Sequence, residues 1–271
     1  GGHGPRRPRR RRVPRLADAC PEPAPTDVCM AAQYQYEVDD RTAAEVFLAE
    51  HGARPGENLT LTGVVGGYSI LMVNVDEALD EVGVLSGTIP ADGVPSGEAV
   101  VDRFVRATPW IGKKILGGRA PIPLGQPHTH LWAPGLALVG NAANHVYAVH
   151  GSGVGMGLIA ARLLAEEAAA ASDPGDPAAL HRYAVRFLRR YGGRLAGADM
   201  FRRLSQTLGR YEIADLLRSG MFGGPMLESG LLQTPFQTDT RSLRTLLGGA
   251  FRHPRYAARM APTASRMLLV Q

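Results

Sequence analysis

Residues 136–155 read LALVGNAANHVYAVHGSGVG. The apolar run 136–139 lies between two glycines, which predicts a short buried strand of the kind found in parallel sheets. The glycines then alternate at 151, 153 and 155, and the apolar stretch after them predicts a helix that begins near Ser152 or Gly153. A helix start offers unpaired N–H groups and the positive end of a dipole, and glycines let a ligand approach the backbone. The stretch therefore predicts a site for an anion or an electron-rich ring edge.

Three familiar glycine motifs do not match this stretch. The dinucleotide motif G-x-G-x-x-G fails because Met156 stands three positions after Gly153. A Walker motif needs G-K-[ST], which does not occur in the chain. A nucleophile elbow around Ser152 needs glycines where His150 and Val154 stand, so a serine hydrolase is not indicated.

The rest of the chain predicts an α+β protein. Alternating apolar residues predict strands in 28–40, in two runs on either side of Gly66-Gly67, and in 81–90, together an antiparallel sheet. Short helices are expected after Thr42, as the N-cap, and from Ser96 to before Pro109. Residues 113–135 predict mostly loop with strand-like pieces. We expect four parts: a disordered basic, proline-rich arm (1–25), a β-rich catalytic and substrate domain (26–135), a strand-loop-helix (136–172) and a helical C-terminal region (173–271).

Charge is distributed unevenly along the chain. Residues 1–15 carry seven Arg and no acidic residue, and residues 182–271 carry 15 Arg against five acidic residues. Such segments suit a solvated helical face or an anionic partner, including a peripheral contact with an anionic membrane. No recognised nucleic-acid-binding fold follows the basic arm, so no specific nucleic acid is expected. Two cysteines, no apolar run long enough to span a membrane and no signal peptide predict a cytoplasmic protein.

A metal site is not expected from the histidines. His128 and His130 stand two apart, but no cysteine is near and no carboxylate falls between Asp102 and Glu166. His145 and His150 remain candidate proton donors near a ligand, without a pattern that singles out either one.

The stretch GNAANHVYAVHGSGVGMGLIAARLLAE resembles the second flavin-binding motif of FAD-dependent monooxygenases and geranylgeranyl reductases. That motif runs Gly-Asp-Ala-Ala, a few residues, Pro, two residues, Gly-x-Gly and then a helix. The segments AAQYQYEVDD, GVVGGYSILMVNV, EVGVLSGTIP and APIPLGQP resemble the geranylgeranyl reductase branch in the same order, so the resemblance covers roughly residues 26–190. The matching motif positions are Gly140, Ala142, Ala143, Gly151, Gly153 and Val154.

The resemblance implies a partial α/β flavoprotein fold and FAD as cofactor. Asn141 stands where the family has an acid that accepts a hydrogen bond from a ribityl hydroxyl, and its amide oxygen keeps that capacity without the charge. The helix start, including Ser152 and Gly155, would face the flavin ring and stabilise negative charge on it. Gly67 and Tyr68 would contribute to the substrate wall.

The chain departs from the family in four ways. The family acid is Asn141 here, the mid-motif proline is Ala148, and of an aromatic-rich substrate motif only Tyr68 is present. The N-terminal G-x-G-x-x-G that holds the ADP half of FAD is also absent from these residues, so we expect a truncated chain.

Three functions follow from the resemblance. The first is an FAD-dependent oxidoreductase that reduces C=C bonds of an isoprenoid or lipid substrate. The second is an FAD-dependent hydroxylase of an aromatic or lipophilic substrate. The third is a non-catalytic remnant or binding protein that does not hold FAD tightly.

Overall fold

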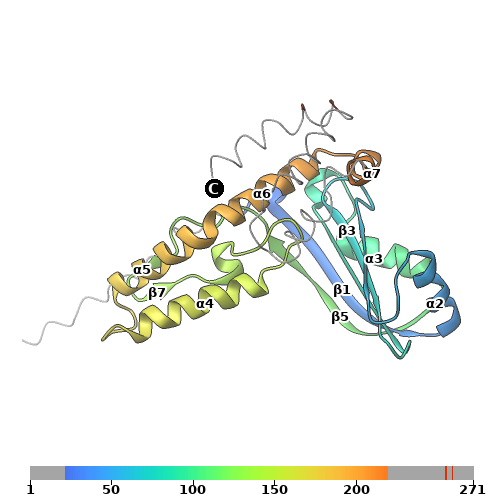
Figure 1. The fold of residues 1–271 in the computed structure, drawn as a ribbon, viewed down its shortest axis with the longest axis horizontal. Coiled ribbons are helices and arrows are strands. Elements are labelled where there is room, and N and C mark those ends of the chain that lie inside the picture. Colours follow the sequence, from blue (N-terminus) through green and yellow to red (C-terminus); the bar gives the residue numbers. More distant parts are fainter. Residues whose placement is uncertain (1–21, 219–253, 255–257, 259–271) are drawn as a thin grey trace, which may run out of the picture.

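A five-stranded antiparallel sheet forms the larger part of the fold (Figure 1). The structure is a computed structural model and describes residues 22–218, 254 and 258. The strand order is β2-β3-β4-β1-β5, and every neighbouring pair is antiparallel. The strands are β1 (Val28–Val38), β2 (Asn58–Thr62), β3 (Ser69–Val75), β4 (Glu81–Thr88) and β5 (Ile111–Pro123). The predicted α+β class with an antiparallel sheet is therefore confirmed.

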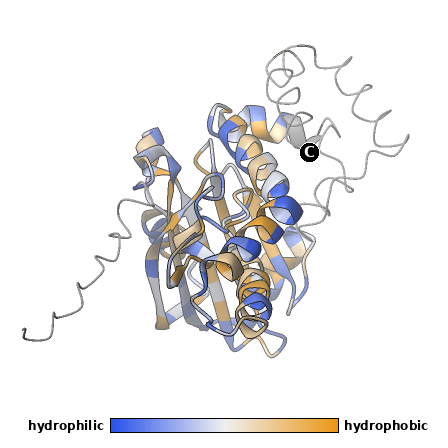
Figure 2. Ribbon diagram, turned by 90° about the vertical axis from the view of Figure 1, so that its left-hand side faces the viewer, coloured by the Kyte–Doolittle hydropathy of each residue, from blue (hydrophilic) through white to orange (hydrophobic). Residues whose placement is uncertain are grey.

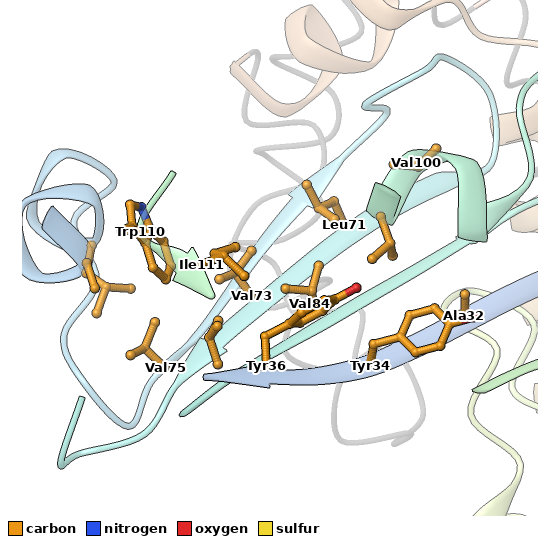
Figure 3. Packing of buried hydrophobic residues seen from close by; sticks show 14 residues of the cluster. Ala32, Tyr34, Tyr36, Leu71, Val73, Val75, Val84, Val100, Trp110 and Ile111 are labelled. Atoms are coloured by element: carbon orange, nitrogen blue, oxygen red, sulfur yellow. The ribbon is translucent and has the colours of Figure 1, made fainter. Parts of the chain in front are cut away.

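The alternating sequence of the strands separates two faces of this sheet. One face buries an apolar set against α2 (Arg41–Glu50) and α3 (Gly97–Arg106), and Figure 3 shows these side chains converging. Since side chains alternate across a strand, the intervening residues point to the opposite face. Neither α2 nor α3 packs against that second face. The core set includes Ala32, Tyr34, Tyr36, Leu71, Val73, Val75, Val84, Val100 and Trp110.

The two helices on the sheet begin at side-chain caps. Ser96 accepts a hydrogen bond from the N–H of Ala99, as the sequence predicts for an N-cap. The prediction of Thr42 as the other N-cap is wrong, because Asp40 takes that place and accepts from the N–H of Ala43 at 2.9 Å. A carboxylate is as good a cap as a hydroxyl, and the strand ends early enough for Asp40 to supply it. Two short 3-10 turns, η1 (Pro25–Asp27) and η2 (Pro90–Asp92), complete this part.

The segment expected to be mostly loop contains the longest strand in the described part of the chain. β5 pairs with β1 along most of its length, with register shifts near Gln35 and Tyr36. Its prolines and glycines are tolerated because it is an edge strand, where a missing donor or an irregular step faces solvent. Gly117 has a φ of 136° and a Cβ there would lie 2.3 Å from the carbonyl oxygen of Gln33, so this close pairing requires glycine.

A helical part is joined to the sheet at one end (Figure 1). It contains a small hairpin, a glycine-containing turn and the helices α4, α5 and α6, whose residues are a mixture of hydrophilic and hydrophobic ones (Figure 2), while α7 lies beside the sheet (Figure 1). The helix α6 runs from this part toward the sheet, so that one continuous element spans both (Figure 1). The elements are β6 (Trp132–Ala133), β7 (Leu136–Ala137), η3 (Gly140–Ala143), α4 (Val154–Ala169), α5 (Pro177–Phe187), the π-helical turn η4 (Leu188–Gly192), α6 (Gly193–Gln206) and α7 (Arg210–Arg218).

One detail of this part differs from the prediction. The run Leu136–Val139 was expected to be a buried parallel strand, but β7 is two residues long and pairs antiparallel with β6. Only Leu138 of the run is buried, and its N–H donates to the carbonyl of Leu131 while its own carbonyl accepts from the hydroxyl of Tyr183. Leu131 and Tyr183 thus satisfy both backbone groups of Leu138, and no parallel neighbour is present in residues 22–218.

A buried ionic network fastens α6 to the start of β1. The guanidinium of Arg202 is fully buried and donates to Asp199, to Asp27 at 2.9 Å and to the carbonyl of Thr26 at 3.0 Å. Arg203 joins the same two carboxylates from the surface. Because these partners lie far apart in the sequence, the network holds the helical part in register with the sheet.

Two predicted segments fall beyond what the structure describes. Residues 1–21 of the expected disordered arm lie outside the described residues, as does almost all of the expected helical C-terminal region (173–271) beyond residue 218. The predicted domain boundaries stay predictions.

Candidate functional site

The glycine stretch folds into a closed loop that leads into α4. After η3, Asn144 adopts a left-handed conformation with φ of 57°, and the N–H of His145 donates to the carbonyl of Gly140 at 2.9 Å. The N–H of Tyr147 then donates to the carbonyl of Ser152 at 2.8 Å, and the N–H of Gly151 donates back to the carbonyl of Tyr147. The motif loop, residues 140–153, therefore holds its shape largely through its own backbone.

The start of α4 lies next to Asn141. The helix begins at Val154, its N-cap is Gly153, and no side chain caps it. A Cβ on Gly153 would lie 2.8 Å from the amide oxygen of Asn141, so glycine is required for that side chain to stand beside the helix start. The unpaired N–H groups in the first turn of α4 and the side-chain amide of Asn141 thus lie close together, at the positive end of the helix dipole.

Several predicted positions line the exposed side of this place. Asn141, Ala142, Val154 and Gly155 are exposed, and Val154 retains 76% of its accessible surface. Ala143 is fully buried and packs beneath the turn. A Cβ on Gly157 would come within 3.5 Å of the Cα of Gly140, so α4 and the turn also approach closely one helical turn farther on.

Tyr68, from the sheet, meets the motif loop. A Cβ on Gly151 would lie 3.4 Å from the hydroxyl of Tyr68 and 3.8 Å from Cδ1 of Ile122. One buried apolar cluster joins the motif loop to the sheet. It contains Val146 and Ala148 from the loop, together with Tyr68 and Cys29. The predicted substrate residue Tyr68 and the predicted motif residue Gly151 are therefore brought together.

Gly67 has a different environment. Its φ is 57°, and its N–H donates to the carbonyl of Leu208, beyond the end of α6, at 2.9 Å. The residue thus shapes the turn before Tyr68 and touches the helical part. A substrate role for Gly67 stays a prediction.

Burial controls the acid–base behaviour of the cluster. It raises the pKa of Tyr68 well above the usual range of a phenol, with a small opposing effect from Arg202. The phenol makes no hydrogen bond within the described part of the chain, so it carries a proton without a partner. Burial also raises the pKa of the Cys29 thiol to about 12, which makes it an inert core residue.

The face of the sheet opposite α2 and α3 continues from this cluster. Ala31, Met72 and Leu85 are half-buried there, and Met72 and Leu85 are directly opposite each other on neighbouring strands. Gln33 pairs with Leu85 and Gln35 follows it, so polar amides border the apolar side chains. This face forms an apolar floor beside Tyr68.

His145 is a residue that the sequence did not distinguish from His150. It is fully buried, its ring stacks on Phe187 at 3.9 Å, and neither ring nitrogen has a hydrogen-bond partner among the described residues. Burial, and to a smaller extent His128, lowers the pKa of His145 to about 4. A neutral imidazole inside the core packs the loop against α5, and no spacing rule in the sequence reveals such a role.

Within 22–218, no three His, Cys, Asp or Glu side chains gather in a way that could hold a metal ion. Over the same range, no helix has both the length and the apolar character needed to cross a bilayer.

Comparison with known proteins gives a specific result. No family model matches the chain. Digeranylgeranylglycerophospholipid reductase 2 of Methanothermobacter thermautotrophicus is 32% identical over 109 residues, which are 40% of this chain and 28% of that protein. A geranylgeranyl bacteriochlorophyll reductase-like protein from Thermoplasma acidophilum shares the fold with a TM-score of 0.61 and 16% identity, over 89% of this chain and 56% of that chain.

A probable FAD-dependent monooxygenase from Pseudomonas aeruginosa aligns with a TM-score of 0.45 and 16% identity, over 75% of this chain and 55% of its own. The chain spans 56% of the length of the solved Thermoplasma acidophilum protein and 28% of the curated reductase. The resemblance to geranylgeranyl reductases that the sequence predicts is confirmed, in sequence over 109 residues and in fold over most of the chain.

Proposed function

We propose that this chain is the substrate and flavin-ring part of an FAD-dependent oxidoreductase that reduces C=C bonds of an isoprenoid lipid. The observation that carries the proposal is one arrangement: an uncapped helix start beside Asn141, with the hydroxyl of Tyr68 beside Gly151 of the same motif loop. A site for a flavin edge and a site for an apolar substrate are thereby adjacent. The reductase similarity over 109 residues supports reduction over hydroxylation.

The residues present fit the ring end of FAD. Asn141 offers an exposed amide oxygen that can accept a hydrogen bond from a hydroxyl. The first-turn N–H groups of Val154 and Gly155 suit an electron-rich ring edge, and Gly153 leaves the space that a side chain would fill. FAD supplies the electron transfer when it is bound, and the protein orients it.

The substrate side depends on the sheet. The apolar floor at Ala31, Met72 and Leu85 suits a hydrocarbon chain, because burying such surface is favourable at roughly 25 cal/mol per Å². Tyr68 holds its proton on Oη throughout the neutral pH range and has no competing partner. We infer that this proton is donated to one carbon of the double bond, while reduced FAD, when bound, would supply a hydride to the other carbon, so that the substrate gains two hydrogens.

The cofactor proposal is tested by titrating FAD into the purified chain and following the quenching of flavin fluorescence. Asn141→Asp restores the family's acid and is expected to tighten binding about tenfold, as a charge-assisted hydrogen bond does. Asn58→Asp adds the same charge at an exposed site on β2 and is expected to change nothing. Failure of both the wild type and Asn141→Asp to bind FAD would contradict the proposal.

The reaction is tested with chemically reduced FAD and a geranylgeranyl lipid, with the product identified by mass spectrometry. A product that has gained two hydrogens per double bond supports the reductase. A product that has gained oxygen, formed in air with a reductant, would instead support the hydroxylase. If the lipid is not consumed and the reduced flavin is not oxidised, the result would favour a non-catalytic binding protein.

A further inference from the structure

A groove lies between α2 and the turn that precedes β5, at the end of the sheet far from the helical part (Figure 1). Its volume is about 560 Å³. None of its described lining residues belongs to the motif loop or to the apolar floor, so the proposed function leaves the groove without a role. Its apolar lining comes from one stripe of α2 and from the turn: Ala43, Val46, Phe47, Pro109 and Trp110.

Aromatic side chains form the floor of this groove. The ring centroids of Phe47 and Trp110 lie 5.4 Å apart, and the ring of His51 lies 4.4 Å from that of Phe47. Trp110 is buried, whereas Val46 retains 51% of its accessible surface. Covering an exposed apolar side chain is favourable, so a segment that lies over Val46 and the aromatic floor gains free energy.

The rim of the groove is acidic. Asp40 and Glu50 both line it and are both exposed, and no Lys or Arg is among its described lining residues. The two acids stand at opposite ends of α2, about 15 Å apart at 1.5 Å per residue. Five residues of a polyproline II helix cover the same length, at about 3.1 Å per residue. Aromatic grooves bind proline-rich segments in this conformation, and carboxylates add pairing with arginines.

The chain itself contains a segment with this chemistry. Residues 5–10 read PRRPRR, and residues 1–15 carry seven Arg and no acidic residue. Pro5 and Pro8 are three residues apart, which places both on one edge of a polyproline II helix with three residues per turn. The arginines between and after them fall on the other edges. This basic segment has no part in the proposed function.

The segment is also long enough to reach the groove. The structure describes the chain from Glu22, and β1 then leads from this end of the sheet to α2. β1 has 11 residues and spans about 36 Å at roughly 3.3 Å per residue. The chain from Pro8 to Glu22 extends up to about 46 Å at the same rise. A contact within one chain has a high effective concentration, so individually weak interactions suffice.

We propose that residues 5–12 of the basic arm bind in this groove of the same chain. The prolines lie on Phe47 and Trp110, and arginines of the segment pair with Asp40 and Glu50. The groove thus holds the basic arm at the end of the sheet remote from the motif loop. The inference is independent of the proposed function, because no flavin or lipid takes part in it.

The inference is tested by limited trypsin digestion of the full chain, with mass spectrometry to measure the rate of cleavage after Arg10 and Arg11. Glu50→Arg places a like charge at the rim and is expected to raise this rate about tenfold. The matched control is Glu45→Arg, which makes the same change at an exposed position of the same helix outside the groove. It is expected to leave the rate at the wild-type value, and melting curves will show that both variants are folded.

A second variant tests the proline contacts without changing the charge. Pro5→Ala with Pro8→Ala is expected to raise the rate of cleavage after Arg10 and Arg11 as well, because the preformed polyproline II conformation is lost. The fluorescence of Trp110, isolated by Trp132→Phe, is expected to shift to longer wavelength in the same variant and in Glu50→Arg, since the groove is then open to water.

Three results would overturn the inference. The first is equal cleavage rates in the wild type and Glu50→Arg, or an equal rise in Glu45→Arg. The second is protection of the arm that increases with protein concentration, which would assign the groove to the arm of a second copy. The third is a wild-type arm that is cleaved freely while a separate peptide of residues 1–16 binds only when Glu50 is present. The groove would then hold a segment of another protein rather than this arm.

Discussion

The amide oxygen of Asn141 stands where Gly153 leaves room for it: a Cβ at Gly153 would lie 2.8 Å from that oxygen. The two residues come from opposite ends of the motif loop. Their proximity gives the helix start of α4 a hydrogen-bond acceptor as well as its own donors. A side chain introduced at Gly153 would therefore displace the Asn141 amide, and the effect on ligand binding can be measured.

Gly153→Ala is expected to displace the Asn141 side chain and to weaken FAD binding by about tenfold, the value of one hydrogen bond of roughly 1 kcal/mol or slightly more. Fluorescence titration with FAD measures the change. Gly118→Ala is the matched control, because a Cβ there meets nothing within 4 Å. Unchanged affinity in Gly153→Ala would mean that Asn141 does not contribute to flavin binding.

Tyr68→Phe is expected to reduce turnover by about a hundredfold, the lower end for loss of a general acid. Stability should hardly change, since the phenol makes no hydrogen bond within the described part of the chain. Single-turnover reduction of a geranylgeranyl lipid gives the rate, and urea unfolding gives the stability. A full rate in Tyr68→Phe would remove Tyr68 from the proton-transfer step.

His145→Leu is expected to stabilise the fold by about 1 kcal/mol at pH 7, because it removes two buried nitrogens that lack partners. Its effect should grow as the pH falls. The pKa of His145 is about 4 in the folded state, below its ordinary value, so the unfolded chain binds a proton that the folded chain does not. Wild-type stability is therefore expected to fall by roughly 3 kcal/mol between pH 6.5 and 4.

Urea unfolding of both proteins across that pH range measures this difference. Carboxylates with lowered pKa, such as Glu98 and Glu167, lose stabilising charge in both proteins alike, so the comparison with His145→Leu isolates the histidine. Parallel pH profiles for the two proteins would show that the ring of His145 is solvated in the folded state.

Arg202→Leu is expected to destabilise the protein by about 3–5 kcal/mol, since it leaves the buried carboxylate of Asp199 without its main partner. Arg203→Gln touches the same carboxylate from a half-exposed position and is expected to cost less than about 1 kcal/mol. Thermal melting in parallel gives both values. Similar losses in the two variants would mean that burial does not distinguish the two arginines.

The strands of the sheet were predictable because their side chains alternate clearly. In 28–38 and 81–88 the apolar positions fall on one face, and the structure buries Tyr34, Tyr36, Val82 and Val84 as a result. β5 was not predictable, since its Gly117, Gly118 and prolines indicate a loop until the neighbouring strand β1 is known. The short strand β7 was misjudged for a related reason: an apolar run does not specify the direction of its partner.

The sequence alone determined the motif loop, the start of α4 and the resemblance to geranylgeranyl reductases, because these depend on residues close together in the chain. Only the tertiary structure decided that Tyr68 meets Gly151 and that His145 is buried against Phe187. Such contacts join distant segments, and they follow from how the helical part packs on the sheet. Local spacing carries no information about that packing, which the buried Arg202 network and the apolar cluster around Tyr68 hold in place.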